Sequence, residues 1–467
     1  MNNVKVKKRI LATSESLCPH CLQRIPAARV ERGDNIYLEK TCPEHGYFSV
    51  PVWRGKQPSY ESWARPRERV ETAVPSTSGG RGCPFDCGHC QEHRQSICCV
   101  LLEVTSRCNL ECPVCFASAG EEEVPDPDLE TIRGWYQRLL DSGGPYNIQL
   151  SGGEPTLRDD LPELIALGRS LGFSFFQLNT NGLRLCREPE FLGALKQAGL
   201  STVFLQFDGT RRDIYLQLRG RDILAEKLEV IKLCGEAGVG VVLVPTVVPG
   251  VNDQNLGEII QLAVENIPVV RGVHFQPISY IGRYPFQPSE QQRITIPEVM
   301  SRIVQQTAEK IKLVDFRPSS IWDGLCAFHA NYIQMPDGEL VPTTRHNEKS
   351  NLENCCDGSC RAGSWGEPKQ VRSFIASRWS ASEPSTQAQE SCCCSQKGEK
   401  GSLDLFLERI KNYTFCISGM AFQDVWDLEL ERLRYCSVHV VAPDGKLIPF
   451  CAYNLTNSKG VPLHRGR

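Results

Sequence analysis

The chain has 467 residues, which corresponds to about three domains at roughly 100–200 residues per domain. Hydrophobic residues make up 41% and charged residues 23%, so the composition excludes a wholly disordered protein. The net charge of −3, from 52 basic and 55 acidic side chains, gives no support for a nucleic-acid partner held by phosphate neutralisation.

Cysteine is the most informative residue type, with 23 copies, an odd number that excludes complete disulfide pairing within one chain. The basic N-terminus is not followed by an apolar run, so no secretory signal is visible. The longest apolar stretch, 239–248, is about half the ~20 residues that a spanning helix needs. We therefore predict a soluble, cytoplasmic protein in which closely spaced cysteines bind metals.

The first motif is a pair of Cys-Pro turns, Cys18-x2-Cys21 and Cys42-x2-His45, joined by a strand-like segment. This spacing predicts a zinc-ribbon or rubredoxin-like domain over residues 1–80 that holds one tetrahedral metal. His45 as the fourth ligand favours zinc over iron, although both metals stay open. The alternative is that His45 is a surface turn residue.

A second group of cysteines lies in the short segment 81–99. Cys83, Cys87 and Cys90 have a three-then-two spacing, and Cys98 and Cys99 follow. Zinc rarely uses this spacing, whereas an iron–sulfur cube is held by thiolates on short loops of this type.

A third group, Cys108, Cys112 and Cys115, follows an apolar run at 100–105. A fourth local cysteine is missing, so a [4Fe–4S] cube held here leaves one iron without a protein ligand. An open coordination position is what separates a catalytic metal site from a structural one. The alternative is that a distant cysteine closes the cube.

Strands and helices alternate from this point. The periodicity predicts strands at 100–105, 147–151, 173–179, 202–207, 239–247 and 273–277, separated by helices at 129–140, 161–171, 191–198, 224–233 and 256–264. Six alternating strands imply a parallel sheet buried on both faces, either open and doubly wound or closed as a barrel. Ligands bind at the carboxyl ends of such strands.

Polar residues and glycines directly follow these strand ends. They are Gly152, Gly153 and Glu154 after the second strand, Asn179 and Asn181 after the third, and Asp208 after the fourth. A Gly-Pro turn with a solvated Glu is the simpler interpretation of residues 152–155 taken alone, and Asn at a strand end is often a turn residue.

Cys-x3-Cys-x2-Cys after a first strand, with Gly-Gly-Glu-Pro after the second, resembles the radical SAM superfamily over about residues 96–285. The resemblance implies a partial (β/α)6 barrel over 100–285. It also implies that S-adenosylmethionine (SAM) chelates the open iron. Gly152 and Gly153 would admit its methionyl amine, and Glu154 would offer that amine a carboxylate.

The same resemblance implies further SAM-binding residues. Asn179, Asn181 and Asp208 would serve the ribose hydroxyls and the methionyl carboxylate, and the stretch 246–248 would meet the adenine through its backbone. The superfamily usually has an aromatic residue just before the third cysteine. Here that position is Val114 and the aromatic is Phe116, which leaves the packing partner of the adenine open.

The wider cysteine pattern is similar to the group that contains archaeal tetraether lipid synthase and a dihydropterin C-methylase, with a bacterial branch of the TrsS type. Members of that group carry auxiliary iron–sulfur clusters. By resemblance, Cys83, Cys87, Cys90 and Cys98 would hold one auxiliary [4Fe–4S] cluster. In the C-terminal domain, 286–467, the ligands of a second would be Cys326, Cys416, Cys436 and Cys451, although an isolated cysteine is more often a small buried hydrophobe.

The C-terminal domain also contains a Ser-, Gln- and Lys-rich stretch, 380–402, which reads as a flexible insert. No function is assigned to the cysteines in or near it: Cys355, Cys356, Cys360, Cys392, Cys393 and Cys394.

The resemblance implies an enzyme that cleaves SAM reductively to a 5′-deoxyadenosyl radical and functionalises an unactivated carbon. C-methylation or C–C bond formation on a lipid, a pterin or an unknown small molecule fits, with a low-potential ferredoxin or flavodoxin as electron donor. The alternative function is a multi-cluster electron carrier without substrate chemistry, which has no need for the Gly- and Asn-bearing strand ends. A zinc-ribbon nucleic-acid module is disfavoured by the net charge of −3.

Overall fold

The computed structural model describes residues 8–64, 80–88, 90–120, 124–319, 324–343, 372, 376, 378–380 and 408–466. Cys355, Cys356, Cys360, Cys392, Cys393 and Cys394 lie outside the described residues. In the described part of the chain, every helix is too short or too polar to cross a bilayer.

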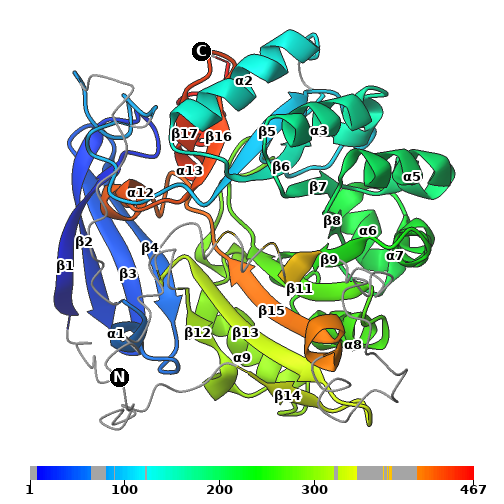
Figure 1. Cartoon of the computed structure of the whole chain (residues 1–467). Coiled ribbons are helices and arrows are strands. Elements are labelled where there is room, and N and C mark those ends of the chain that lie inside the picture. The colour runs from blue at the N-terminus through cyan, green and yellow to red at the C-terminus, as the bar shows by residue number, and fades with distance from the viewer. Residues whose placement is uncertain are drawn as a thin grey trace, which may run out of the picture.

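The N-terminal ribbon is an antiparallel sheet at one side of the molecule (Figure 1). Its elements are β1 (Lys8–Leu17), β2 (Arg24–Arg32), β3 (Asn35–Cys42), β4 (Gly46–Arg54) and the short helix α1 (Tyr60–Trp63). The sheet is docked on C-terminal residues: Ser16 Oγ donates to the Leu428 carbonyl at 2.5 Å, and Arg29 Nε donates to the buried Glu429 carboxylate at 2.7 Å. These buried contacts fix the ribbon to the rest of the chain.

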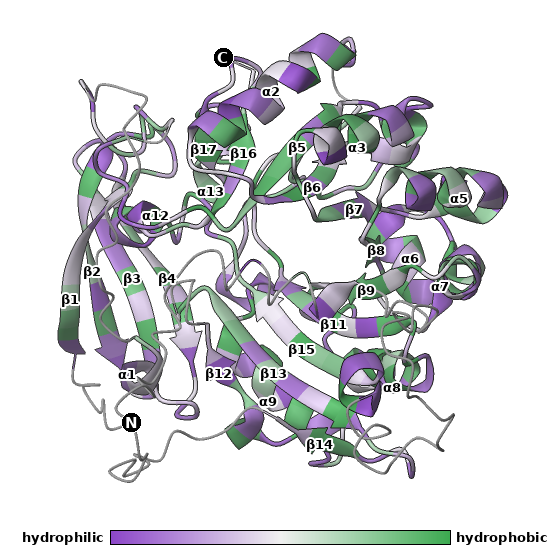
Figure 2. Ribbon diagram, viewed as in Figure 1, coloured by the Kyte–Doolittle hydropathy of each residue, from purple (hydrophilic) through white to green (hydrophobic). Residues whose placement is uncertain are grey.

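The central sheet follows the predicted alternation. It contains β5 (Cys99–Thr105), α2 (Leu129–Asp141), β6 (Asn147–Gly152), α3 (Leu161–Ser170), β7 (Phe176–Thr180), α4 (Leu183–Arg187), α5 (Pro189–Ala198), β8 (Thr202–Gln206), α6 (Arg212–Arg219), α7 (Leu224–Glu236), β9 (Gly240–Val244), β10 (Thr246–Val247), α8 (Leu256–Glu265) and β11 (Val270–Pro277). Strands β5 to β9 and β11 pair in parallel in the order β5-β6-β7-β8-β9-β11. The helices carry apolar residues on one side and polar residues on the other, as Figure 2 shows for α2 and α5, because one side packs on the sheet.

The C-terminal region is built into the same sheet. Its elements are α9 (Ile296–Gln306), β12 (Arg317–Pro318), β13 (Ala327–Gln334), β14 (Leu340–Pro342), β15 (Thr414–Met420), α12 (Leu430–Arg434), β16 (Val438–Val441), β17 (Leu447–Pro449) and α13 (Phe450–Tyr453). β15 pairs in parallel with β11, and β16 pairs in parallel with β5 (Figure 1). The six predicted strands are therefore flanked on both edges by parallel strands from the C-terminal third of the chain.

The structure differs from the predicted elements at three points. Pro245, which has no backbone N–H, separates β9 from β10, where the sequence predicted one strand. Helices α4 and α6 were missed; each has at most eight residues, too few for a clear apolar period. The parallel arrangement brings the carboxyl ends of the strands to one edge, where the site lies.

Candidate functional site

A cavity of about 620 Å³ lies at the carboxyl ends of the strands and continues along the inner face of the sheet. Its volume is within the range of small-molecule sites, about 300–1,000 Å³. Most of the residues that the sequence predicted for the cluster and for SAM line it: Cys108, Cys112, Cys115, Phe116, Gly152, Gly153, Glu154, Asn179 and Asn181. Because the strands are parallel, motifs that are distant in the sequence lie together at the carboxyl ends of the strands.

The cysteine loop is held by a backbone and side-chain clamp from residues 282–283. Cys115 and Arg283 exchange backbone hydrogen bonds at 3.0 and 2.9 Å. The Arg283 guanidinium donates to the carbonyls of Cys112 and Ala119, both at 3.1 Å. Gly282 has φ +65°, and a Cβ there would lie 2.4 Å from the carbonyl oxygen of Cys115. The clamp therefore fixes the loop that carries the three thiols.

Gly152 and Gly153 pack against this same loop. A Cβ on Gly152 would lie 2.3 Å from the Thr105 carbonyl oxygen, and one on Gly153 would lie 2.0 Å from that of Arg107. The backbone N–H of Gly153 donates to the Thr105 carbonyl at 2.8 Å. By resemblance, we expected glycine here so that the methionyl amine of SAM could approach the backbone. In the structure, glycine is required because any side chain would collide with the backbone of residues 105–107.

Glu154 is 1% exposed, and its carboxylate is engaged by the protein itself. Oε1 accepts from the hydroxyls of Thr156 at 2.7 Å and Thr180 at 2.6 Å, and Oε2 accepts from the Asn181 N–H at 2.7 Å. Glu154 therefore joins the end of β6 to the end of β7. The solvated-Glu interpretation is wrong for this chain.

The two predicted asparagines point to different parts of the cavity. Asn181 Nδ2 donates to Asn109 Oδ1 at 2.7 Å, next to the first cysteine of the loop. Asn179 bonds instead with two glutamines deeper on the inner face of the sheet: its Oδ1 accepts from Gln177 at 2.7 Å, and its Nδ2 lies 3.4 Å from Gln149 Oε1.

Asp208 is fully buried and is not among the residues that line the cavity. It makes a bidentate ion pair with Arg219, with N···O distances of 2.7 and 2.8 Å. Arg219 lines the cavity and hydrogen-bonds the Cys112 thiol. Burial opposes the charge of Arg219, but Asp208 more than compensates and raises its pKa. The structure thus places a fixed positive charge, supported by Asp208, beside the cysteine loop.

A buried lysine stands behind this pair. Lys227 Nζ donates to Gln206 Oε1 at 3.0 Å and to the Asn181 carbonyl. Burial lowers the pKa of Lys227 to about 7, against the opposing effect of Asp208. Sequence reasoning missed both Arg219 and Lys227. The sequence offered only one hint of these residues: a basic side chain lies in each of the two helices that follow Asp208. The first of these helices, α6, was not predicted.

Phe116 lines the cavity and packs on Phe450, with ring centroids 5.5 Å apart. Thr246 and Val248, from the stretch predicted to meet the adenine, line the cavity too. The backbone of this stretch is already engaged: the Thr246 N–H donates to Asp208, and Asn252 bonds both the Thr246 carbonyl and the Val248 N–H. Phe116 therefore offers the adenine an apolar ring, and Thr246 and Val248 line the cavity without free backbone groups of this kind.

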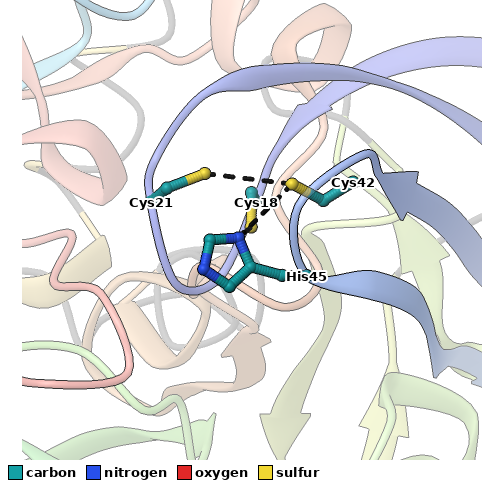
Figure 3. A group of neighbouring side chains, drawn as sticks. All are labelled: Cys18, Cys21, Cys42 and His45. Carbon is teal, nitrogen blue, oxygen red and sulfur yellow. Dashed lines mark hydrogen bonds between the residues drawn. The ribbon is translucent and has the colours of Figure 1, made fainter.

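The ribbon brings its four predicted ligands together (Figure 3). The side chains of Cys18, Cys21, Cys42 and His45 point toward one another, and their donor atoms all lie within 4.8 Å. Cys42 Sγ lies 3.9 Å from Cys21 Sγ and 3.5 Å from His45 Nδ1. A tetrahedral zinc with bonds of about 2.3 Å to sulfur has ligand–ligand edges of about 3.8 Å, so the donor set fits this ion. Although burial opposes it, the hydrogen bond from His45 helps lower the pKa of Cys42 to about 6, which favours the thiolate.

Cys83, Cys87 and Cys90 of the second group lie close enough to act on one another. The Cys87 thiol hydrogen-bonds Cys83, and its pKa is raised by Cys83, by burial, and by the neighbouring Cys90 and Cys436. Cys98 is also buried, but the charged side chain that acts on it is Arg372. Cys436, which follows α12, also acts on Cys87 and packs in the same apolar cluster as Cys83 and Cys87.

The four cysteines predicted for the second auxiliary cluster do not all lie together. Cys451 lies close to Cys436 and Cys326, both of which raise its pKa together with burial. Cys326 Sγ accepts from Arg432 at 3.0 Å. Cys416, on β15, interacts with Arg378 and Ser418 instead. The structure therefore brings Cys326, Cys436 and Cys451 together without Cys416.

Comparison with known proteins agrees with this organisation. Residues 102–263 match the model of the radical SAM superfamily, and residues 10–54 match that of the HMPTM N-terminal zinc ribbon domain. The sequence is 36% identical to 7,8-dihydro-6-hydroxymethylpterin dimethyltransferase of Methanocaldococcus jannaschii, over 96% of this chain and 94% of the relative. The chain belongs to the radical SAM superfamily.

This radical SAM protein is an enzyme that cleaves SAM at a [4Fe–4S] cluster and functionalises an unactivated carbon. Another relative is a probable GTP 3′,8-cyclase of Methanothermobacter marburgensis, 27% identical over 55% of this chain and 87% of the cyclase. A solved structure, native anSMEcpe with bound AdoMet, aligns over 45% of this chain and 60% of its own, with 19% identity and a TM-score of 0.36.

The zinc ribbon of this radical SAM enzyme yields a direct prediction. Cys42→Ser should remove about one zinc per chain, because structural zinc needs all four ligands. The melting temperature should fall by several degrees, since metal binding contributes folding free energy. Zinc is measured by elemental analysis, and the melting temperature by calorimetry under anaerobic conditions.

The matched control is His20→Asn. Its ring lies 5.1 Å from that of His45, outside the ligand set, so the zinc should stay. Undiminished zinc in Cys42→Ser would contradict the assignment of the site.

Proposed function

We propose that this enzyme abstracts hydrogen from a carbon of a dihydropterin and that this carbon then takes a methyl group from a separate methyl donor, since the cleaved SAM leaves as methionine with its methyl group still on sulfur. One observation carries the proposal: the identity to 7,8-dihydro-6-hydroxymethylpterin dimethyltransferase runs through nearly the whole of both chains, ribbon included. Identity confined to the radical SAM core would support the chemistry but not the substrate. Within a mostly apolar lining, the cavity also presents the amide side chains of Gln149, Gln177 and Asn179, which suit a polar heterocycle.

Cys108, Cys112 and Cys115 are the proposed ligands of the catalytic cluster. They are half-buried, they line the cavity, and their loop is fixed by Arg283. When bound, the cluster and SAM supply the 5′-deoxyadenosyl radical. Three thiolates suit a cube with one open iron, so the donor set fits the group.

The surrounding side chains are proposed to bind and orient SAM. Arg219 provides a positive charge for the methionyl carboxylate, and Asp208 positions Arg219 through their bidentate ion pair. Glu154 positions Asn181, whose side chain lies beside the cysteine loop. Phe116 and the side chains of Thr246 and Val248 are the proposed neighbours of the adenine.

An auxiliary cluster is proposed at Cys83, Cys87, Cys90 and Cys436. This set keeps the three sequence-adjacent ligands and replaces Cys98 by Cys436, because Cys436 packs in the same apolar cluster as Cys83 and Cys87 and acts on Cys87. Cys326 and Cys451 lie beyond Cys436 and would take part in any second auxiliary cluster. A low-potential ferredoxin or flavodoxin is the proposed electron donor.

This ligand set gives a paired prediction. Cys436→Ala should lose at least one iron per chain relative to the wild type after anaerobic reconstitution, because the three remaining thiolates leave one iron of the cube without a protein ligand, whereas Cys98→Ala should keep the wild-type iron content. Iron and sulfide are quantified against protein by amino-acid analysis. The reverse ranking of the two variants would restore Cys98 as the ligand.

The function itself is tested by hydrogen transfer. The reconstituted enzyme is incubated with dithionite, SAM and 7,8-dihydro-6-hydroxymethylpterin carrying deuterium on its aliphatic carbons. Mass spectrometry should then show deuterium in 5′-deoxyadenosine, because the radical takes its hydrogen from the substrate carbon.

GTP serves as the comparison substrate, since it shares the aminopyrimidinone ring and is named in the cyclase relative. Ribose-deuterated GTP should give unlabelled 5′-deoxyadenosine. Deuterium from GTP but not from the dihydropterin would overturn the proposed substrate while leaving the radical chemistry intact.

A further inference from the structure

The inner face of the sheet, below the cysteine loop, carries a chain of hydrogen-bonded amides. Gln177 Nε2 donates to Asn179 Oδ1 at 2.7 Å, and Asn179 Nδ2 lies 3.4 Å from Gln149 Oε1. Gln149 Nε2 in turn donates to Cys99 Sγ at 3.5 Å. Gln149 and Gln177 are register partners on β6 and β7, and all four side chains line the cavity. Barrel interiors are usually filled by branched apolar residues. A row of amide side chains on this face is therefore unusual and indicates a role in binding a polar ligand.

The chain of amides ends in an acceptor that has no partner. Gln177 is 1% exposed, and its Oε1 is buried without a hydrogen-bond partner among the described residues. A buried polar atom left unsatisfied costs about 1–3 kcal/mol. An N–H donor of a molecule in the cavity would remove that cost.

An aromatic wall stands beside the amides. Phe204, the register partner of Asn179, packs on Trp379 with ring centroids 4.7 Å apart. His274 lies 5.9 Å from Phe204 and donates to or accepts from Ser418 Oγ at 2.9 Å. Burial lowers the pKa of His274 to about 4, so the ring is neutral. Flat aromatic faces next to an amide edge suit a planar heterocycle.

Formal charge is confined to the opposite end of the cavity. Among its described lining residues, the side chains that carry charge are Glu154 and Arg219, both at the cysteine loop. SAM has a charged methionyl end, and the amide end suits an uncharged polar ligand.

We propose that Gln149, Gln177 and Asn179 form the substrate subsite. It binds the aminopyrimidinone edge of a dihydropterin, and Gln177 Oε1 accepts a hydrogen bond from the exocyclic amine. The ring lies along Phe204 and Trp379. This assignment rests on the proposed function and adds to it the residues that set specificity. An alkyl chain would leave Gln177 Oε1 buried and unpaired, so the subsite disfavours a lipid.

Anaerobic equilibrium dialysis of the reconstituted enzyme with SAM tests the subsite. Two probes are used: 7,8-dihydro-6-hydroxymethylpterin and its dihydrolumazine analogue, in which oxygen replaces the exocyclic amine. The wild-type enzyme should prefer the pterin by about tenfold, because the analogue presents an acceptor to the Gln177 acceptor. Gln177→Met should bind the pterin about tenfold more weakly and lose the preference.

Two further variants keep the test decisive. Gln149→Met, which removes the last amide of the chain, should weaken pterin binding about threefold. Gln261→Met, an exposed amide on α8 bonded to Glu265, should match the wild type. Wild-type pterin affinity with full discrimination in both Gln177→Met and Gln149→Met overturns the subsite. A wild-type enzyme that binds neither probe overturns the proposed substrate as well, so the two failures are distinguishable.

Discussion

Cys112→Ala should abolish the formation of 5′-deoxyadenosine and remove about four iron per chain, because two thiolates do not hold a [4Fe–4S] cube. Cys112 also contacts Arg219, so its loss removes the thiolate that this guanidinium faces. The measurements are 5′-deoxyadenosine by liquid chromatography after reduction with dithionite, and iron and sulfide content. The zinc content should not change, since the ribbon has its own ligands.

Cys186→Ala is the matched control. Cys186 is half-buried on α4 and packs against the main apolar core, and it is not among the residues that line the cavity. This variant should keep wild-type iron content and product formation, with a loss of about 1 kcal/mol or less in the free energy of unfolding. Product formation by a fully iron-loaded Cys112→Ala would contradict the assignment of the catalytic cluster.

Gly282→Ala should inactivate the enzyme although it replaces no proposed metal ligand. Its Cβ would lie 2.4 Å from the carbonyl oxygens of Cys115 and Phe116, which are backbone atoms and have no rotamer to change. The positive φ of +65° adds strain for any L side chain. We expect a loss of about 3 kcal/mol in the free energy of unfolding. Displacement of the loop should also lower the content of the catalytic cluster.

Gly172→Ala separates the effect of the steric clash from that of the positive φ. Gly172 also has a positive φ, of +97°, but its Cβ would meet nothing within 4 Å. This variant should lose only about 1 kcal/mol and keep its iron. Equal iron loss in both variants, or full iron content in Gly282→Ala, would show that the clamp does not control the cysteine loop.

Residue spacing along the chain was enough to predict the chemistry. Cys108, Cys112 and Cys115 are neighbours along the chain, so their spacing alone predicts one cluster loop. The ligands of the ribbon are two local pairs in matching turns, and these four residues converge in the structure. The alternation of strands with helices could be predicted because each strand is a short apolar run buried on both faces, as in β5 and β9.

The residues that surround the cluster loop come together only through long-range packing. The sequence assigned Cys436 to a different cluster from Cys87, and only the pairing of β16 with β5 brings residue 436 to the apolar cluster that contains Cys83 and Cys87. Arg219 and Arg283 lie far along the chain from the cysteine loop that they contact. The inward direction of Gln149 and Gln177 follows from strand register, and a shift of one residue would reverse it. Local spacing specifies ligands that share a loop, whereas contacts between strand ends depend on how the whole sheet closes.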